Sequence, residues 1–181
     1  NVQEIYSNDN FYRLKGKNLF LKNKKTNIQN EKELLQLVKT AVLCNNARFE
    51  ETENGFSFIG DPTEEALVRL ALDLKLNKKN LAEKEPRLKE FEFDSNRKMM
   101  SILRDSGRNN TLYTKGAPEI ILENSSFELI NGEIVNLTSK RKKELLEDSA
   151  KLQEDALRVL GFAYKQFSKD SNAEEKGLIF L

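Results

Sequence analysis

The sequence predicts an α+β domain in which an antiparallel β-sheet is flanked by helices. Segments with strand-like alternation occur in clusters between helical segments and do not alternate with them one by one, which is typical of this class. The pair Asn131-Gly132 separates the short apolar segments Phe127–Ile130 and Glu133–Leu137 and is a strong β-hairpin signal. A polar loop at Asp105–Asn110 gives a second hairpin. Because a hairpin joins antiparallel neighbours, we expect an antiparallel sheet.

The first part of the chain predicts short strands followed by a helix. Residues 1–30 contain short apolar pieces, which fit strand or loop better than helix. From Glu31 to Cys44 the apolar residues recur at the spacing of an amphipathic helix. A loop and a short strand at Gly55–Ile59 are expected to follow.

A second helix is predicted to begin after Asp61. Asp61 can cap it, Pro62 suits the first helical position, and Glu64 occupies the acidic position of a capping box. The residues expected to face the core from this helix are Leu67, Leu70, Ala71 and Leu74.

Three strands are predicted in the middle of the chain. Arg87–Asp94 alternates, and the segments Lys98–Arg104 and Thr111–Lys115 lie on either side of the polar loop. The sequence Gly116-Ala117-Pro118-Glu119 then turns the third strand into a helix with proline at its first position.

The last part of the chain predicts a long helix and two strands. Thr138 can cap a helix that is expected to run to Arg158. Gly161–Phe167 is a strand candidate, and Gly177–Leu181 is apolar and strand-like. Because a natural terminus seldom lies inside a core element, we expect residues 1–181 to be a single domain of a larger protein.

Composition excludes several classes of function. The chain has no histidine and a single cysteine, Cys44, which excludes Ser-His-Asp and Cys-His catalysis, histidine-containing zinc sites and internal disulfides. Lys and Arg (30) balance Asp and Glu (29), which argues against bulk electrostatic binding of nucleic acid. No carboxylate cluster has evident metal-ligand spacing, so no metal site is expected. Neither GxxxxGKS/T nor GxGxxG occurs, so a nucleotide site would use neither phosphate loop.

Four short segments indicate a specific function. They are Gly60–Leu67 (GDPTEEAL), Phe93–Met100 (FDSNRKMM), Tyr113–Glu119 (YTKGAPE) and Asp155–Leu160 (DALRVL). Together and in this order they resemble the nucleotide-binding (N) domain of type II P-type cation-transporting ATPases, especially the bacterial and archaeal calcium-pump-like members. The resemblance covers roughly residues 31–181, and the opening segment 1–30 matches only loosely. It implies an antiparallel sheet flanked by helices, inserted into a haloacid-dehalogenase-like phosphorylation domain.

The resemblance also implies an ATP site. Phe93 matches the aromatic residue that stacks on adenine, Glu64 the carboxylate near the adenine amino edge, and Lys115 the lysine at the floor of the pocket. Arg158 matches the arginine that reaches the phosphates across the domain boundary. The other residues expected to line this cleft are Thr63, Gly116 and Ala117. Such a site is chemically reasonable, because stacking contributes about 1–3 kcal/mol per base and Lys and Arg neutralise phosphate oxygens.

Each of the four main residues also has a plain structural alternative. Glu64 can be a helix cap, and Phe93 can pack in the core beside Phe91. Lys115 can be a solvated strand end, and Arg158 can compensate a helix dipole. The occurrence of all four motifs in order favours the functional interpretation for these four residues.

Two departures from the family pattern affect the mechanism. Animal calcium pumps carry an arginine two residues after the stacking phenylalanine, where this chain has Ser95, and Arg97 is a candidate to supply part of that charge. The Asp-Lys-Thr-Gly-Thr phosphorylation motif is absent. No catalytic residue is therefore expected in this chain, because the nucleophile belongs to a separate phosphorylation domain.

The resemblance further implies a cytoplasmic domain of an integral membrane cation pump, with calcium the favoured ion. Its expected partners are ATP or ADP and the phosphorylation and actuator domains of the parent, with magnesium supplied mainly through the phosphorylation domain. No nucleic acid, direct membrane contact or oligomer is expected, and the domain alone should bind ATP without turnover. Two alternatives remain: a degenerate N-like domain with a regulatory or protein-interaction role, and a free-standing phosphotransfer enzyme.

Overall fold

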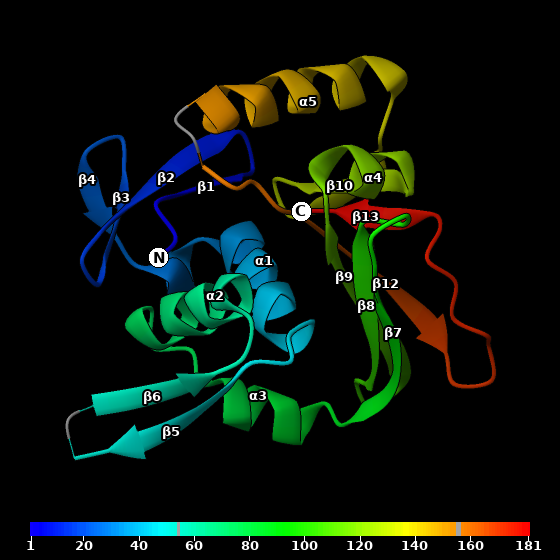
Figure 1. Ribbon diagram of the computed structural model, residues 1–181. Coiled ribbons are helices and arrows are strands. Elements are labelled where there is room, and N and C mark those ends of the chain that lie inside the picture. The colour runs from blue at the N-terminus through cyan, green and yellow to red at the C-terminus, as the bar shows by residue number, and fades with distance from the viewer. Residues whose placement is uncertain (54, 155–156) are drawn as a thin grey trace.

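The computed structural model describes residues 1–53, 55–154 and 157–181. Its centre is a seven-stranded sheet with the order β11-β10-β13-β12-β9-β8-β7 (Figure 1). The strands are β7 (Arg87–Asp94), β8 (Met99–Asp105), β9 (Asn109–Gly116), β10 (Ser125–Ile130), β11 (Glu133–Asn136), β12 (Gly161–Ser168) and β13 (Leu178–Phe180). Neighbouring strands are antiparallel, apart from β10 and β13, which pair in parallel. The predicted α+β class is therefore confirmed.

Two smaller sheets complete the β-structure of the described residues. The opening segment forms a four-stranded antiparallel sheet of β1 (Glu4–Ser7), β2 (Asn10–Lys15), β3 (Asn18–Leu21) and β4 (Lys24–Thr26), followed by a short 3-10 helix, Ile28–Asn30. Strands β5 (Arg48–Thr52) and β6 (Gly55–Ile59) form a separate hairpin. The sequence predicts only a loop between α1 and β6. This prediction is wrong, because Arg48–Thr52 forms strand β5. Phe49 is the only apolar residue of β5, so this strand has no alternation to detect.

The helices lie on both faces of the large sheet. They are α1 (Lys32–Leu43), α2 (Pro62–Asp73), α3 (Lys78–Lys84), α4 (Pro118–Glu123) and α5 (Ser139–Glu154). One core cluster joins α1 and α2 to Met100, Ile102 and Tyr113 of the sheet. A second cluster joins α4 and α5 to Met99, Leu103 and Leu112. Successive residues of β8 and β9 thus alternate between two cores, which defines an α1/α2 face and an α4/α5 face of the sheet.

Two helices differ from the sequence expectation. Helix α3 was not predicted. Asn77 caps its start, but none of its residues is buried, so its sequence lacks the amphipathic pattern that would indicate a helix. Helix α5 begins as expected, because the Thr138 hydroxyl accepts a hydrogen bond from the Arg141 N–H at 3.2 Å. The expected continuation to Arg158 is wrong, because residues 157–160 are not helical. The chain must return from α5 to β12, and extended backbone covers more than twice the distance per residue of a helix. Asp155 and Ala156 lie outside the described residues.

No helix in the described part of the chain is both long and apolar enough to span a membrane.

Candidate functional site

The start of α2 directs Glu64 toward the large sheet. The Asp61 carboxylate accepts hydrogen bonds from the backbone N–H groups of Thr63 (2.8 Å) and Glu64 (3.3 Å), so the predicted helix cap is confirmed. The Glu64 carboxylate does not turn back to the cap residue. Its Oε1 accepts from Lys115 Nζ at 2.5 Å, and its Oε2 accepts from the Asn46 N–H at 3.1 Å. The capping-box alternative for Glu64 is therefore wrong.

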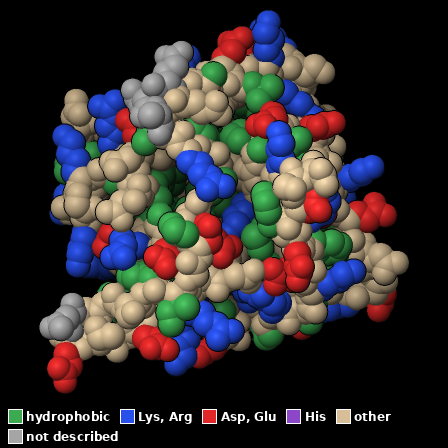
Figure 2. All heavy atoms as spheres, viewed as in Figure 1, with side chains coloured by type: hydrophobic (Ala, Val, Ile, Leu, Met, Phe, Trp, Pro, Cys, Tyr) green, Lys and Arg blue, Asp and Glu red, His purple; other side chains and the backbone are tan. Residues whose placement is uncertain are grey.

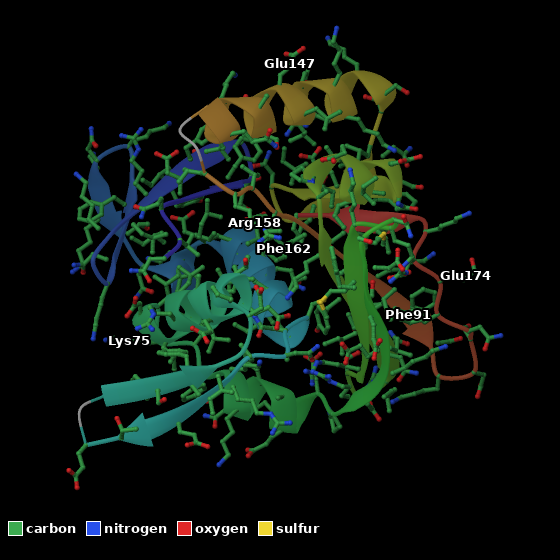
Figure 3. The ribbon with its side chains drawn as sticks, in the orientation of Figure 1. Lys75, Phe91, Glu147, Arg158, Phe162 and Glu174 are labelled. Atoms are coloured by element: carbon green, nitrogen blue, oxygen red, sulfur yellow. The ribbon has the colours of Figure 1, made fainter. Side chains whose placement is uncertain are left out.

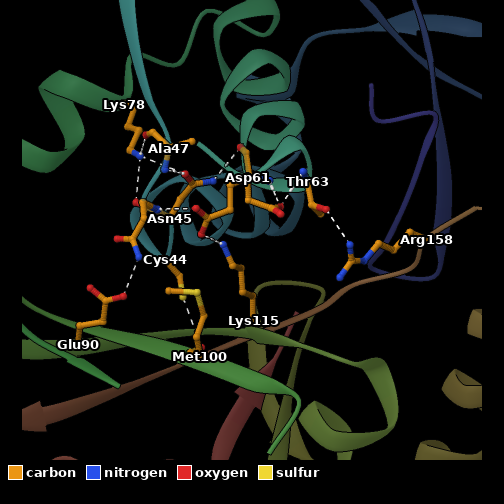
Figure 4. Close-up of polar contacts among 12 residues, drawn as sticks. Cys44, Asn45, Ala47, Asp61, Thr63, Lys78, Glu90, Met100, Lys115 and Arg158 are labelled. Carbon is orange, nitrogen blue, oxygen red and sulfur yellow. Dashed lines mark hydrogen bonds and ion pairs between the residues drawn. The ribbon is translucent and has the colours of Figure 1, made fainter. Parts of the chain in front are cut away.

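Lys115 lies under this carboxylate, near the end of β9. It is paired with Met100 on β8 and with Phe162 on β12, and it points toward the α1/α2 face (Figure 4). Only 7% of the residue is exposed, so the alternative of a solvated strand end is wrong. A carboxylate accepts about four hydrogen bonds and an ammonium donates three, so Glu64 and Lys115 both retain capacity for a ligand.

Phe93 lies at the end of β7 and is 60% exposed, so the core-packing alternative is wrong for this residue. A β-bulge explains the exposure. Phe91 is opposite Ser101 and Asp94 is opposite Met99, so three steps on β7 match two steps on β8. Asp94 therefore shares the α4/α5 face with Met99, and its neighbour Phe93 turns to the face that carries Met100 and Lys115. Phe91 stays on the α4/α5 face, half-buried against the second core cluster.

Arg158 reaches the start of α2 from the segment before β12. Its NH1 group donates to the Thr63 hydroxyl at 3.1 Å (Figures 3 and 4). Thr63 and Glu64 are adjacent, so the residues that Arg158 and Lys115 contact both lie in the first turn of α2. Residues 157–160 are not helical and the Arg158 guanidinium is bonded at the start of α2, so the alternative in which Arg158 compensates the dipole of its own helix is wrong.

Gly116 and Ala117 form the turn from β9 to α4. A Cβ atom at Gly116 would lie 2.4 Å from the Lys98 carbonyl oxygen and 2.8 Å from Met99 Cα, so close contact with β8 by itself requires glycine here. The Ala117 N–H donates to the same Lys98 carbonyl at 2.9 Å. These contacts fix the chain immediately after Lys115.

Arg97 does not take the role expected of it. Its guanidinium forms an ion pair with Glu175 and donates to the Glu92 carbonyl oxygen at 2.6 Å. The Glu175 carboxylate also accepts from the Ser101 hydroxyl at 2.6 Å, and Ser101 belongs to the α4/α5 face. Arg97 is thus held on the side of the sheet opposite Lys115.

Sequence reasoning missed the loop that supports Glu64. Asn45 is fully buried, and its Nδ2 group donates to the Glu64 carbonyl oxygen at 3.0 Å. The Asn46 N–H bonds the Glu64 carboxylate, and Lys78 Nζ donates to both Asn45 and Ala47. Polar residues that follow a helix are typical of an ordinary surface loop, so the local sequence contains no signal for this role of Asn45 and Asn46.

A hollow with hydrophobic and basic side chains at its walls opens on the face shown in Figure 2. A mainly apolar cavity of about 360 Å³ lies between α1, α2, α5 and β12, and Thr63 and Arg158 line it. Glu64, Phe93 and Lys115 do not line it. The cavity therefore adjoins the site at the Thr63–Arg158 contact and does not contain the acidic and basic pair. In the described part of the chain no group of three or more acidic or cysteine side chains could hold a metal ion.

Comparison with known proteins identifies the family of this chain. The family described as "P-type ATPase, cytoplasmic domain N" matches residues 33–181. The chain belongs to this family. The resemblance inferred from the four motifs is thereby confirmed, and the family description assigns such N domains to the cytoplasm.

Relatives of this N domain are ion pumps by name. It is 37% identical over 158 residues to "Calcium-transporting ATPase 1" of Bacillus cereus, an alignment that covers 86% of this chain and 17% of the relative. It is 32% identical over 149 residues to "Calcium-transporting ATPase 1" of Lactococcus lactis, covering 80% and 17%. It is also 32% identical over 163 residues to "Sodium/potassium exporting P-type ATPase cta3" of Schizosaccharomyces pombe, covering 89% and 15%. The chain thus spans about one sixth of the length of these relatives.

Proposed function

We propose that this N domain binds ATP and presents the terminal phosphate to the phosphorylation domain of a parent cation-transporting P-type ATPase. The observation that supports the proposal most is the convergence of separate segments on one face. The Glu64–Lys115 contact of 2.5 Å joins α2 to β9, and the adjacent Thr63–Arg158 contact of 3.1 Å joins α2 to the segment before β12. The bulge in β7 turns Phe93 to this same face.

Each residue has a chemical role in this proposal. The exposed ring of Phe93 offers a stacking surface for adenine. The Glu64 carboxylate accepts a hydrogen bond from the adenine amino group. Lys115 and Arg158 balance the charge of the phosphate groups, and the Thr63 hydroxyl holds the Arg158 guanidinium at the start of α2. Gly116 and Ala117 position the chain beside Lys115.

The domain contributes positioning to phosphoryl transfer. Orientation of a bound reactant can supply a large part of such a barrier. The aspartyl nucleophile and the magnesium site belong to the phosphorylation domain of the parent, and the domain alone acts as a monomeric ATP-binding module. We further propose that the parent is an integral membrane protein and that it transports calcium, because several relatives are named calcium-transporting ATPases.

Titration calorimetry of the purified chain with ATP tests this proposal. Phe93→Ala should raise the Kd about 5- to 150-fold, because stacking contributes about 1–3 kcal/mol per base. Phe127→Ala is the matched control, since Phe127 is 37% exposed on β10, at a distance along the sheet from β7. Equal affinity of a folded Phe93→Ala variant would refute the stacking role.

A phosphate-release assay with excess ATP completes the test. The chain should bind ATP without releasing phosphate, and magnesium should change the Kd only slightly if adenine contributes most of the affinity. Sustained release that is lost in Lys115→Ala would contradict the binding-module interpretation.

A further inference from the structure

Lys78 is a half-buried cation with an unusual set of partners. Its Nζ donates to the Asn45 backbone oxygen at 3.0 Å, to Asn45 Oδ1 at 3.2 Å and to the Ala47 backbone oxygen (Figure 4). Among the described residues Lys78 forms no ion pair with a carboxylate. Its three donors are therefore used on neutral oxygens of one short loop, Asn45–Ala47.

The position of Lys78 is not explained by its own helix. Lys78 is the first residue of α3, and a positive charge at a helix N-terminus opposes the helix dipole. The loop that it bonds follows directly after the end of α1, whose cap residue is Cys44. A cation there is favourable, because helix C-termini carry partial negative charge and unpaired carbonyl groups.

The same loop holds Glu64 by two hydrogen bonds. The Asn45 side-chain amide donates to the Glu64 carbonyl oxygen at 3.0 Å, and the Asn46 N–H donates to the Glu64 carboxylate at 3.1 Å. Asn45 Oδ1 accepts from both the Ala47 N–H (2.9 Å) and Lys78, which fixes the orientation of its amide. A continuous series of contacts thus runs from Lys78 through the loop to Glu64 and on to Lys115.

We infer that Lys78 is a positioning residue for the nucleotide site, acting through the loop Asn45–Ala47 on the Glu64 carboxylate. The inference rests on the proposed function. The ammonium group holds the carbonyl oxygens of the loop together, and the loop in turn presents an N–H and an amide to Glu64. Without the charge the loop relaxes, and the carboxylate loses the orientation in which it meets adenine and Lys115.

The charge state of Lys78 gives this role a pH dependence. Burial lowers the pKa of Lys78 to about 8, with Glu64 acting to raise it and Arg104, Lys115 and Arg87 acting to lower it. The ammonium form therefore predominates at pH 7 and is the minor form at pH 9. ATP affinity should fall over this interval, because only the charged form donates all three hydrogen bonds.

Titration calorimetry with ATP on the 181-residue chain tests the inference. At pH 7, Lys78→Met should raise the Kd about 3- to 10-fold, the effect of one weakened hydrogen-bonded contact. Lys79→Met is the matched control, because Lys79 is its exposed neighbour in α3 and should leave the Kd unchanged. Lys78→Arg keeps the charge and should recover part of the affinity. Between pH 7 and pH 9 the Kd of the wild type should rise more steeply than that of Lys78→Met.

The outcomes separate this inference from the proposed function. If the wild type does not bind ATP, the proposed function is wrong and the role of Lys78 is refuted with it. If the wild type binds ATP and Lys78→Met binds equally well, or with the same pH dependence, only the role of Lys78 is refuted. If Lys78→Met does not fold, the pH dependence of the Asn46 amide chemical shift in the wild type tests the role of Lys78 instead. This shift should titrate near pH 8 together with the ATP affinity, and a constant shift would refute the inference.

Discussion

The contact between Glu64 and Lys115 predicts a strong energetic coupling between these two side chains. The side chain of Glu64 is 13% exposed and that of Lys115 is 9% exposed, so removing either charge leaves the other buried without its partner. Breaking a fully buried pair on one side costs about 3–5 kcal/mol. Because each side chain keeps some contact with water, we expect Glu64→Gln and Lys115→Met each to lower the free energy of unfolding by about 2–4 kcal/mol.

The double variant should lose less than the sum of the two single variants. Once both charges are removed, no buried charge is left unpaired, and a coupling energy of about 1–3 kcal/mol is expected. Urea denaturation of the wild type, both single variants and the double variant measures this coupling. Lys151→Met is a control for a lysine whose side chain is 66% exposed and pairs with Asp148, and its effect should not exceed about 1 kcal/mol.

The same four proteins measure the link between this pair and ligand binding. Each single variant should also raise the Kd for ATP, because both side chains are proposed to contact the nucleotide. Additive stability losses of the two single variants would refute the reasoning, since they would show that the charges do not depend on each other in the folded domain.

The contacts of Lys78, Gly116 and Arg97 also have measurable consequences. Burial lowers the pKa of Lys78 from 10.5 to about 8 in the folded domain, so between these pH values the unfolded chain binds more protons than the folded domain. The free energy of unfolding of the domain should therefore rise with pH in this interval. Denaturation from pH 7.5 to 10 should show this slope in the wild type and not in Lys78→Met. Gly116→Ala should lower the free energy of unfolding by about 1–3 kcal/mol, because the new Cβ atom would lie 2.4 Å from the Lys98 carbonyl oxygen. Thermal denaturation measures this loss, and a variant as stable as the wild type would contradict the close contact. Arg97→Ala should lower the free energy of unfolding by about 0.5–1.5 kcal/mol, because the ion pair with Glu175 and the bond to the Glu92 carbonyl oxygen are lost. The Kd for ATP should stay within about twofold, since these partners lie on the face of the sheet opposite Lys115. A large loss of affinity would place Arg97 in the site.

Features set by neighbouring residues could be predicted from the sequence. The start of α2 depends on Asp61 and Pro62, and the turn between β10 and β11 depends on Asn131-Gly132, whose two residues adopt positive φ as this hairpin type requires. Both lie where the sequence indicated. The burial of Lys115 could be expected only through the resemblance, because a lysine at a strand end is ordinarily solvated.

Features set by distant residues could not be predicted. The bulge that turns Phe93 away from the face of Phe91 depends on the register of β7 against β8, which no alternation within β7 reveals. Arg97 is held by Glu175, 78 residues away in the chain. The contact of Lys78 with Asn45 spans 33 residues and begins in a helix without an apolar face. In each case the partner is chosen by the packing of the sheet and not by local sequence.

Amide chemical-shift mapping of the chain during an ATP titration tests the central claim most directly. The claim is that one face of the sheet, between the start of α2 and the ends of β7 and β9, binds the nucleotide. The largest shifts should fall at Thr63 and Glu64, around Phe93, at Lys115–Ala117 and at Arg158, with little change in β10 and β11 at the far end of the sheet order. Shifts confined to β10 and β11, or no shifts at millimolar ATP, would contradict the account.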